Sequence, residues 1–192
     1  MKVGLYFGSF NPIHVGHLVI ANYIAEYSDL DQVWFVVTPH NPFKKKSSLL
    51  DNYQRLEMVY RATKDYTKLK PSDIEFNLPQ PNYTINTLAY IQEKYPNHEF
   101  CLIMGEDNLK SFHKWKNYEL ILENHDIYVY PRIPKQQVET AFDTHKNIHF
   151  VDAPVMEISS TFIRKAIKAG KNVKPMLPEF VWEYLDEMNF YK

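Results

Sequence analysis

Short apolar runs alternate with helix-like patterns along most of the chain. The apolar runs predict β-strands over residues 3–7, 32–38, 72–78, 99–104, 126–130 and 148–151. Amphipathic spacing predicts helices over residues 18–27, 51–65, 84–95, 108–112, 118–123, 160–169 and 178–188. The nearly continuous apolar run at residues 33–37 is typical of a parallel strand covered on both faces. This alternation predicts an α/β fold with a mainly parallel sheet and helices on both faces.

Several helix boundaries carry their own signals. Asp51 is followed three residues later by Gln54, as in a capping box, while Pro96 and Gly170 mark two helix ends. A length of 192 residues suits one domain. We therefore expect a single domain over residues 1–192, in which residues 159–192 form a C-terminal helical part.

Composition excludes several classes of protein. Lys and Arg number 22 against 23 Asp and Glu, so bulk charge gives no reason to expect nucleic-acid binding. Cys101 is the only cysteine, which rules out an intramolecular disulfide, and its apolar run favours a buried thiol over a nucleophile. Neither a signal peptide nor an apolar run of membrane-spanning length is visible. We expect a cytoplasmic protein without a membrane partner.

The segment GSFNPIHVGH, residues 8–17, lies where the first strand gives way to a helix. In open α/β sheets, ligands bind outside the carboxyl ends of the strands. A helix N-terminus adds free N–H groups and a positive dipole end, which suit a phosphate. Glycine, asparagine and proline are also ordinary turn residues. The two interpretations are therefore a phosphate or nucleotide site and a structural turn.

Common site signatures are missing from the sequence. It contains no G-x-x-x-x-G-K-[ST] loop and no G-x-G-x-x-G fingerprint. It also lacks H-E-x-x-H, paired cysteines and a G-x-S-x-G elbow. His14 and His17 have no neighbouring carboxylate to complete a metal-ligand set. These absences disfavour P-loop, zinc and serine-hydrolase chemistry.

Two segments at opposite ends of the chain resemble one superfamily. Residues 9–17, SFNPIHVGH, resemble the (G/T)-x-F-D/N-P-x-H-x-G-H signature of the nucleotidyltransferase superfamily. Residues 158–164, ISSTFIR, resemble its I-S-S-T-x-I-R motif, although Ser-Ser-Thr alone is equally a helix N-cap. The H-V-G-H element also resembles the H-I-G-H element of class I aminoacyl-tRNA synthetases.

Three interior segments narrow the resemblance to one family. They are PHNPFK at 39–44, YTINTL at 83–88, and GEDNL at 105–109 with Phe112 and Trp115. Together they resemble the bacterial nicotinate-nucleotide adenylyltransferase family from residue 4 to about residue 188. The resemblance implies a Rossmann-like nucleotidyltransferase fold. It also implies transfer of the adenylyl group of ATP to nicotinate mononucleotide, with release of pyrophosphate, in NAD biosynthesis.

The resemblance implies an ATP site in which His14 and His17 contact the phosphates as catalytic residues. It assigns ATP binding to Gly8, Ser9, Phe10, His14, His17, Gly105, Asp107, Arg132, Ser160, Thr161 and Arg164. Mg²⁺ is expected on the ATP phosphates and not on protein ligands, as is usual for this ion.

The resemblance also implies an acceptor site. It assigns acceptor binding to His40, Lys44, Tyr83, Thr84, Trp115 and Lys116. Trp115 is expected to stack on the pyridine ring, with a core tryptophan as the alternative. Lys44 competes with its neighbours Lys45 and Lys46 for a phosphate contact, and all three also fit a solvated loop.

The sequence departs from the family pattern at a few positions. Asn11 and Asn86 stand where Asp is usual, which puts any role requiring an anion there in doubt. The common Arg-Pro-Gly reads PRIP at residues 131–134. The alternatives are pantetheine-phosphate adenylyltransferase or a cytidylyltransferase, a non-catalytic nucleotide-binding module, and a tRNA-binding module. The sequence gives no oligomeric state.

Overall fold

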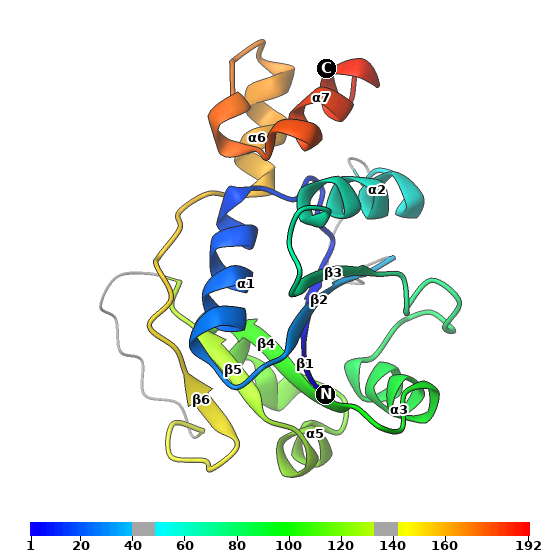
Figure 1. Cartoon of the computed structure of the whole chain (residues 1–192), viewed down its shortest axis with the longest axis vertical. Helices are drawn as coiled ribbons and strands as arrows, with labels where there is room; N and C mark the ends of the chain where they lie inside the picture. Colours follow the sequence, from blue (N-terminus) through cyan, green and yellow to red (C-terminus); the bar gives the residue numbers. More distant parts are fainter. Residues whose placement is uncertain (40–48, 133–141) are drawn as a thin grey trace.

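A six-stranded parallel sheet forms the centre of the protein (Figure 1). The computed structural model describes residues 1–39, 49–132 and 142–192. The strands are β1 (Lys2–Gly8), β2 (Gln32–Val37), β3 (Leu69–Ser72), β4 (Glu99–Gly105), β5 (Ile127–Tyr130) and β6 (Ile148–Phe150). Their order in the sheet is β3-β2-β1-β4-β5-β6. The order reverses between β1 and β4, and in open α/β sheets ligands bind outside the carboxyl ends of the strands at such a reversal.

Over the described residues, seven α-helices and two short 3-10 helices connect and cover the strands. They are α1 (Val15–Tyr27), α2 (Asn52–Thr63), α3 (Thr84–Lys94), α4 (Glu106–Lys110), η2 (Phe112–Lys114), α5 (Tyr118–Asn124), α6 (Ser160–Lys168), η3 (Lys174–Met176) and α7 (Glu179–Glu187). The predicted capping box is confirmed, because Asp51 and Gln54 cap the start of α2 reciprocally. The Ser159 hydroxyl accepts a hydrogen bond from the Phe162 N–H and caps α6.

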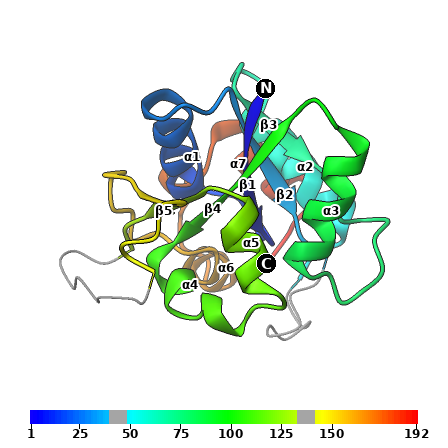
Figure 2. The ribbon, with the colours of Figure 1, turned by 90° about the horizontal axis from the view of Figure 1, so that it is seen from below.

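The sheet separates two apolar layers. Successive strand residues point to opposite faces, so Leu5 packs in one layer and Tyr6 in the other. The layer containing Tyr6 is formed with α1, α2, α6 and α7, whereas α3 and α5 cover the opposite face. Figure 2 shows α1 and α3 on opposite sides of the strands. The predicted parallel sheet with helices on both faces is therefore confirmed.

The predicted third strand at residues 72–78 is wrong. The strand is Leu69–Ser72, paired with β2 from Val33↔Leu69 to Val36↔Ser72. Pro71 lies within this edge strand, where the missing N–H is tolerated. Residues 73–78 form turns instead, and the Phe76 N–H donates to the Asp73 carbonyl. Ile74 is buried within these turns, so an apolar pattern arises there without a strand.

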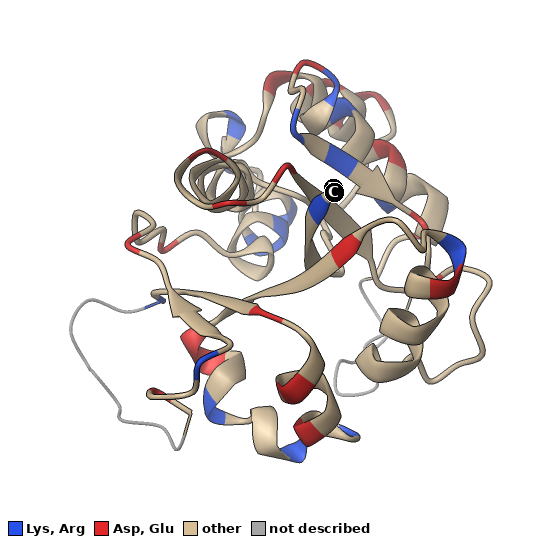
Figure 3. Ribbon diagram, turned by 60° about the horizontal axis from the view of Figure 1, so that its bottom comes forward, with Lys and Arg blue, Asp and Glu red and all other residues tan. Residues whose placement is uncertain are grey.

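The C-terminal helices lie at the carboxyl ends of the strands. Figure 1 shows α6 and α7 beyond the sheet, next to the first turn of α1 and to α2. Figure 3 shows basic and acidic residues interspersed over the described elements, as the near-zero net charge leads one to expect. None of the described helices has the length and apolar character needed to cross a membrane.

Candidate active site

The turn that follows β1 is strained and tightly packed. Phe10 has φ of 44°, a left-handed conformation that is unusual for a bulky residue. Its buried ring packs edge-on against Phe35, at 5.3 Å between centroids, and against His17 at 5.2 Å. A Cβ on Gly8 would lie 2.7 Å from the Phe10 ring, so glycine is needed for this approach. Strain of this kind concentrates at functional sites.

The two histidines of the first motif form a stacked pair at the start of α1. Their ring centroids are 3.7 Å apart, with an interplanar angle of 23°. His14 is the N-cap residue, and its backbone N–H donates to Nδ1 of His17 at 3.3 Å. This bond requires a lone pair on Nδ1, so the neutral His17 ring carries its proton on Nε2. Such a ring presents a donor suited to a phosphate oxygen.

His14 is a buried neutral histidine near pH 7. Burial lowers the pKa of His14 from 6.5 to about 4, and the positive charge of Arg132 acts in the same direction. The ring therefore carries no standing positive charge near neutral pH. The pair consists of a buried His14 and a half-buried His17.

The buried His14 predicts a loss of stability in acid. Its pKa in the folded state is below its ordinary value, so between pH 6.5 and 4 the unfolded chain binds a proton that the folded protein does not. Lowering the pH through this window therefore destabilises the protein, by up to roughly 3 kcal/mol through His14. Urea unfolding at pH 7 and pH 4.5 measures this loss. His14→Asn should lose less stability than wild type, and equal losses would contradict the assignment.

The C-terminal motif is hydrogen-bonded to the first motif. Nη1 of Arg164 donates to the Asn11 carbonyl at 2.7 Å, and the Ser160 hydroxyl donates to the Pro12 carbonyl at 2.9 Å. Nη2 of Arg164 also donates to Thr161 Oγ1 at 3.3 Å. These bonds hold the two motifs together. The first turn of α6 and the first turn of α1 share one end of the sheet.

Asn11 uses its side-chain oxygen as an acceptor within the protein. Its Oδ1 accepts from the Leu50 N–H at 3.3 Å and from the Tyr191 hydroxyl at 2.5 Å. Burial raises the pKa of Tyr191, which keeps this hydroxyl protonated as a donor. A neutral amide oxygen accepts both hydrogen bonds. Residue 11 therefore needs no negative charge to hold Leu50 and Tyr191 in place.

A charged pair lies at the ends of β4 and β5. Nε of Arg132 contacts Oδ1 of Asp107 at 3.3 Å, and the Arg132 guanidinium lies 5.6 Å from the Tyr130 ring centroid. A Cβ on Gly105 would approach Asp107 Oδ1 to 2.5 Å and the Arg132 side chain to 3.1 Å. Glycine at this strand end therefore allows both side chains to lie close to the backbone. Both remain exposed and accessible to a ligand.

Three of the predicted acceptor residues lie near one another. Nζ of Lys116 lies 4.6 Å from the ring centroid of Tyr83, the N-cap residue of α3, and Thr84 is the first residue of that helix. Trp115 directly precedes Lys116 in the chain and is half-buried, with its ring edge-on to Phe112 at 5.4 Å. Its ring also packs against the apolar cluster on the face covered by α3 and α5, as the alternative of a core tryptophan expects. His40 and Lys44 lie outside the described residues.

A buried carboxyl supports the segment before α3. The Thr87 hydroxyl donates to Oε1 of Glu75 at 2.7 Å, and the Asn82 side-chain amide donates to the Glu75 carbonyl at 3.1 Å. Burial raises the pKa of Glu75. These bonds fix the start of α3, and with it Tyr83, to the turns that follow β3. Glu75 is not among the site residues predicted from the sequence.

Comparison with known proteins identifies the family. A family model described as cytidylyltransferase-like matches residues 5–166. A relative from Flavobacterium johnsoniae, named "probable nicotinate-nucleotide adenylyltransferase", is 69% identical over 192 residues and covers 100% of both chains. A relative of the same name from Christiangramia forsetii is 72% identical over 191 residues, covering 100% of this chain and 98% of the relative. The chain belongs to the nicotinate-nucleotide adenylyltransferase family.

Solved structures share the fold of this adenylyltransferase family member. A Plasmodium falciparum nicotinic acid mononucleotide adenylyltransferase complexed with NaAD has a TM-score of 0.82. The match covers 99% of this chain and 97% of that chain at 19% identity. The complex of the Plasmodium enzyme with APC gives a TM-score of 0.81. The predicted Rossmann-like nucleotidyltransferase fold is confirmed.

The donor groups of this adenylyltransferase site suit phosphates better than a protein-bound metal. Over the described ranges, one cluster of three potential metal ligands is found, Glu99, Cys101 and Asp126, at the amino ends of the strands. Nζ of Lys2 lies 2.8 Å from Asp126 and 3.4 Å from Glu99, so a cation already neutralises that cluster. At the opposite end of the sheet, the side chains described above are imidazoles, hydroxyls and guanidinium groups, with Asp107 paired to Arg132.

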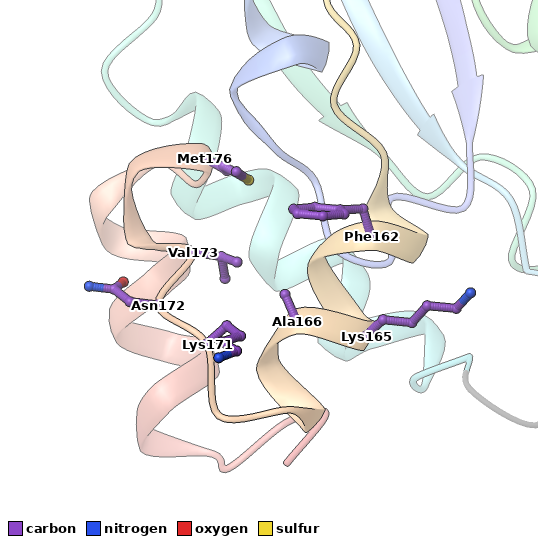
Figure 4. A pocket seen from close by; sticks show the side chains of 7 residues that line it. All are labelled: Phe162, Lys165, Ala166, Lys171, Asn172, Val173 and Met176. Atoms are coloured by element: carbon purple, nitrogen blue, oxygen red, sulfur yellow. The ribbon is translucent and has the colours of Figure 1, made fainter.

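A surface cavity of about 420 Å³ lies between α6 and η3 (Figure 4). Figure 4 shows Phe162, Ala166, Val173 and Met176 around an apolar hollow. The predicted ATP residue Thr161 is not among its lining residues, although it precedes Phe162 on the same helix. The cavity is therefore separate from the candidate site of this family member.

Arg55 was missed by the sequence analysis, although the sequence of α2 contained a signal. The buried face of α2 comprises Arg55, Met58, Val59, Ala62 and Thr63. Arg55 therefore occupies an apolar-stripe position, where a charged side chain is unusual. Its side chain reaches the turn that carries the first motif, because Nη1 donates to the Ser9 carbonyl at 2.7 Å.

Proposed function

We propose that this protein transfers the adenylyl group of ATP to nicotinate mononucleotide, forming nicotinate adenine dinucleotide and pyrophosphate. The observation that carries the proposal is the hydrogen bonding between the two nucleotidyltransferase motifs, at the carboxyl ends of β1 and β4. The acceptor is proposed from the names of full-length relatives up to 72% identical to this chain. The grouping of Tyr83, Thr84 and Lys116 supports the same acceptor site.

The reaction is a displacement at the α-phosphorus of ATP. A phosphate oxygen of the mononucleotide forms the new P–O bond, while the bond to the pyrophosphate leaving group breaks. The attacking phosphate is already ionised near neutral pH, so no side chain has to remove a proton. The main barriers are charge repulsion and orientation, which the protein lowers through positioning and electrostatic stabilisation.

We assign charge stabilisation on the α-phosphate of the transferring adenylyl group to His14 and His17. The proton on Nε2 of His17 donates toward a phosphate oxygen, and the stacked His14 ring holds His17 in place. Thr161 and Arg164 face the β- and γ-phosphates from the first turns of α6, where the helix dipole also favours an anion. Ser9 and Ser160 support the turn on which these phosphates rest.

We assign the adenosine half of ATP to the ends of β4 and β5. Asp107 offers a carboxylate to the ribose hydroxyls, and Arg132 lies beside it, near the adenine. Gly105 leaves room for the nucleoside at the strand end, where a side chain would meet Asp107 and Arg132. Gly8 and Phe10 shape the opposite wall of the crevice.

We assign Mg²⁺ to the phosphates of ATP. Bound there, the ion would offset the negative charge that develops on the leaving pyrophosphate. The described side chains of the site, rich in imidazole, hydroxyl and guanidinium groups, contact the phosphate oxygens that remain.

A substrate panel tests the function directly. ATP and CTP are each combined with nicotinate mononucleotide, nicotinamide mononucleotide and phosphopantetheine, and pyrophosphate release is followed for every pair. We expect the largest kcat/KM for ATP with nicotinate mononucleotide, because an anionic carboxylate is matched by the donors near Thr84 and Lys116. A larger kcat/KM with phosphopantetheine or with nicotinamide mononucleotide overturns the acceptor assignment.

Trp115 is expected to bind the acceptor by stacking on its pyridine ring. Trp115→Ala should raise the KM for nicotinate mononucleotide about fivefold and leave the KM for ATP within twofold, because an aromatic contact contributes about 1 kcal/mol. Trp115→Phe keeps an aromatic face and should recover most of the affinity. Steady-state kinetics with each substrate varied in turn measure both constants. Equal rises in the two KM values would point to a folding defect and contradict the stacking role.

A further inference from the structure

Arg55 is the largest fully buried side chain in the described part of the protein, with none of its surface exposed. Burial lowers its pKa to about 10, so the guanidinium remains protonated near neutral pH. Within the described ranges, no carboxylate forms an ion pair with it at 4.0 Å or less. A buried cation without an ionic partner is costly. The hydrogen bonds of the guanidinium must therefore offset this cost.

The guanidinium is fully hydrogen-bonded, and every acceptor is a neutral oxygen. Its five N–H groups reach the carbonyl oxygens of Leu50 at 3.0 Å, Ser9 at 2.7 Å, Thr38 at 2.8 Å and Pro39 at 3.2 Å, and Asn52 Oδ1 at 2.7 Å. Four of the five acceptors are backbone carbonyls. Arg55 therefore fixes the course of the chain and does not pair with other side-chain charges.

The backbone carbonyls that accept hydrogen bonds from Arg55 come from two separate parts of the candidate site. Ser9 belongs to the turn after β1, which carries the first motif. Thr38 and Pro39 directly precede residues 40–48 in the sequence, and Leu50 follows them closely. One planar group therefore holds the ATP turn together with both flanks of the segment that contains His40 and Lys44.

We propose that Arg55 is a positioning residue that joins the turn carrying the ATP motif to the flanks of the segment carrying acceptor-binding residues. This inference rests on the proposed function, because it assigns the two parts to the two substrates. Holding both parts on one rigid guanidinium fixes the turn after β1 relative to the end of β2 and the start of α2. Arg55 contributes through the backbone of Ser9, Thr38, Pro39 and Leu50, without touching the reacting atoms.

Lysine cannot reproduce this arrangement. Arginine presents five donors in a fixed planar fork, whereas lysine has three donors on one atom. Arg55→Lys keeps the positive charge and loses at least two of the five hydrogen bonds. The variant therefore separates the geometric role of Arg55 from its charge.

The test compares Arg55→Lys with Met58→Ala. Met58 lies one turn further along the buried face of α2 and is fully buried, so its truncation destabilises the same helix without removing a hydrogen bond to either turn. Both variants are assayed well below their Tm values. We expect Arg55→Lys to raise the KM for ATP and the KM for nicotinate mononucleotide about tenfold each, with a lower kcat. Met58→Ala should leave both KM values within twofold.

Binding of ATP alone, measured by isothermal titration calorimetry, distinguishes this inference from the proposed function. If wild type binds ATP but does not use nicotinate mononucleotide, the acceptor assignment fails, while a tenfold weaker Kd of Arg55→Lys for ATP still supports positioning. If folded Arg55→Lys binds ATP as tightly as wild type does, the inference is overturned. It is also overturned if the wild-type protein does not bind ATP.

If Arg55→Lys does not fold, Asn52→Ala provides the test, because it removes one of the five hydrogen-bond acceptors of Arg55. Its ATP Kd should weaken two- to threefold, and an unchanged Kd overturns the inference.

Discussion

Replacing His17 by alanine is expected to lower kcat for pyrophosphate release by about 100- to 1,000-fold, as when a preorganised donor to developing charge is removed from an active site. The physical reason is the backbone bond from His14 to Nδ1 of His17, which leaves the proton of the neutral ring on Nε2. Alanine offers no donor at this position. The crevice at the end of β1 then lacks one of its groups for stabilising the transferring phosphate.

The His17→Ala experiment requires a control on the same helix. Asn22 is an exposed residue of α1, so Asn22→Ala changes the helix surface without entering the crevice. Its kcat should remain within twofold of wild type. Thermal unfolding of both variants separates lost chemistry from lost structure, because His17 also contacts the rings of His14 and Phe10. Folded His17→Ala with a kcat within threefold of wild type would contradict the site assignment.

The sheet was largely predictable, because apolar runs of strand length report burial on both faces. The error at the third strand has a local cause. Leu69–Ser72 is a short edge strand that contains a lysine and a proline, so neither its length nor its composition resembles a buried strand. The buried Ile74 in the following turns imitates strand periodicity. Edge pairing depends on the register with β2, which local sequence does not encode.

The meeting of the two motifs was predictable from the resemblance, but the individual bonds were not. Residue types indicated that Ser160 and Arg164 belong near the phosphates. They did not indicate that these side chains also donate to the Pro12 and Asn11 carbonyls. Every residue has a backbone carbonyl, so a hydrogen bond to a carbonyl does not require a particular residue type and cannot be recognised from a sequence motif. The same reason explains why Arg55, with four carbonyl partners, escaped detection.

Arg164→Ala is expected to lower kcat/KM for ATP about 100-fold, because a charge-assisted hydrogen bond contributes about 1.5–3 kcal/mol. The guanidinium has two tasks that alanine cannot perform. It holds the Asn11 carbonyl at 2.7 Å and Thr161 Oγ1 at 3.3 Å, and it supplies positive charge beside the proposed β- and γ-phosphate positions. Because these positions belong to ATP, the KM for nicotinate mononucleotide should change less than threefold.

Two further variants separate the tasks of Arg164. Arg164→Lys keeps the charge but cannot reach both oxygens in one plane, so its kcat/KM for ATP should lie between those of wild type and Arg164→Ala. Lys168→Ala removes a positive charge from an exposed position at the end of the same helix, and should leave kcat/KM within twofold. If Lys168→Ala matches the loss in Arg164→Ala, general electrostatic attraction explains the effect. If Arg164→Lys retains full activity, charge alone suffices, and the bond to the first motif is not required for catalysis.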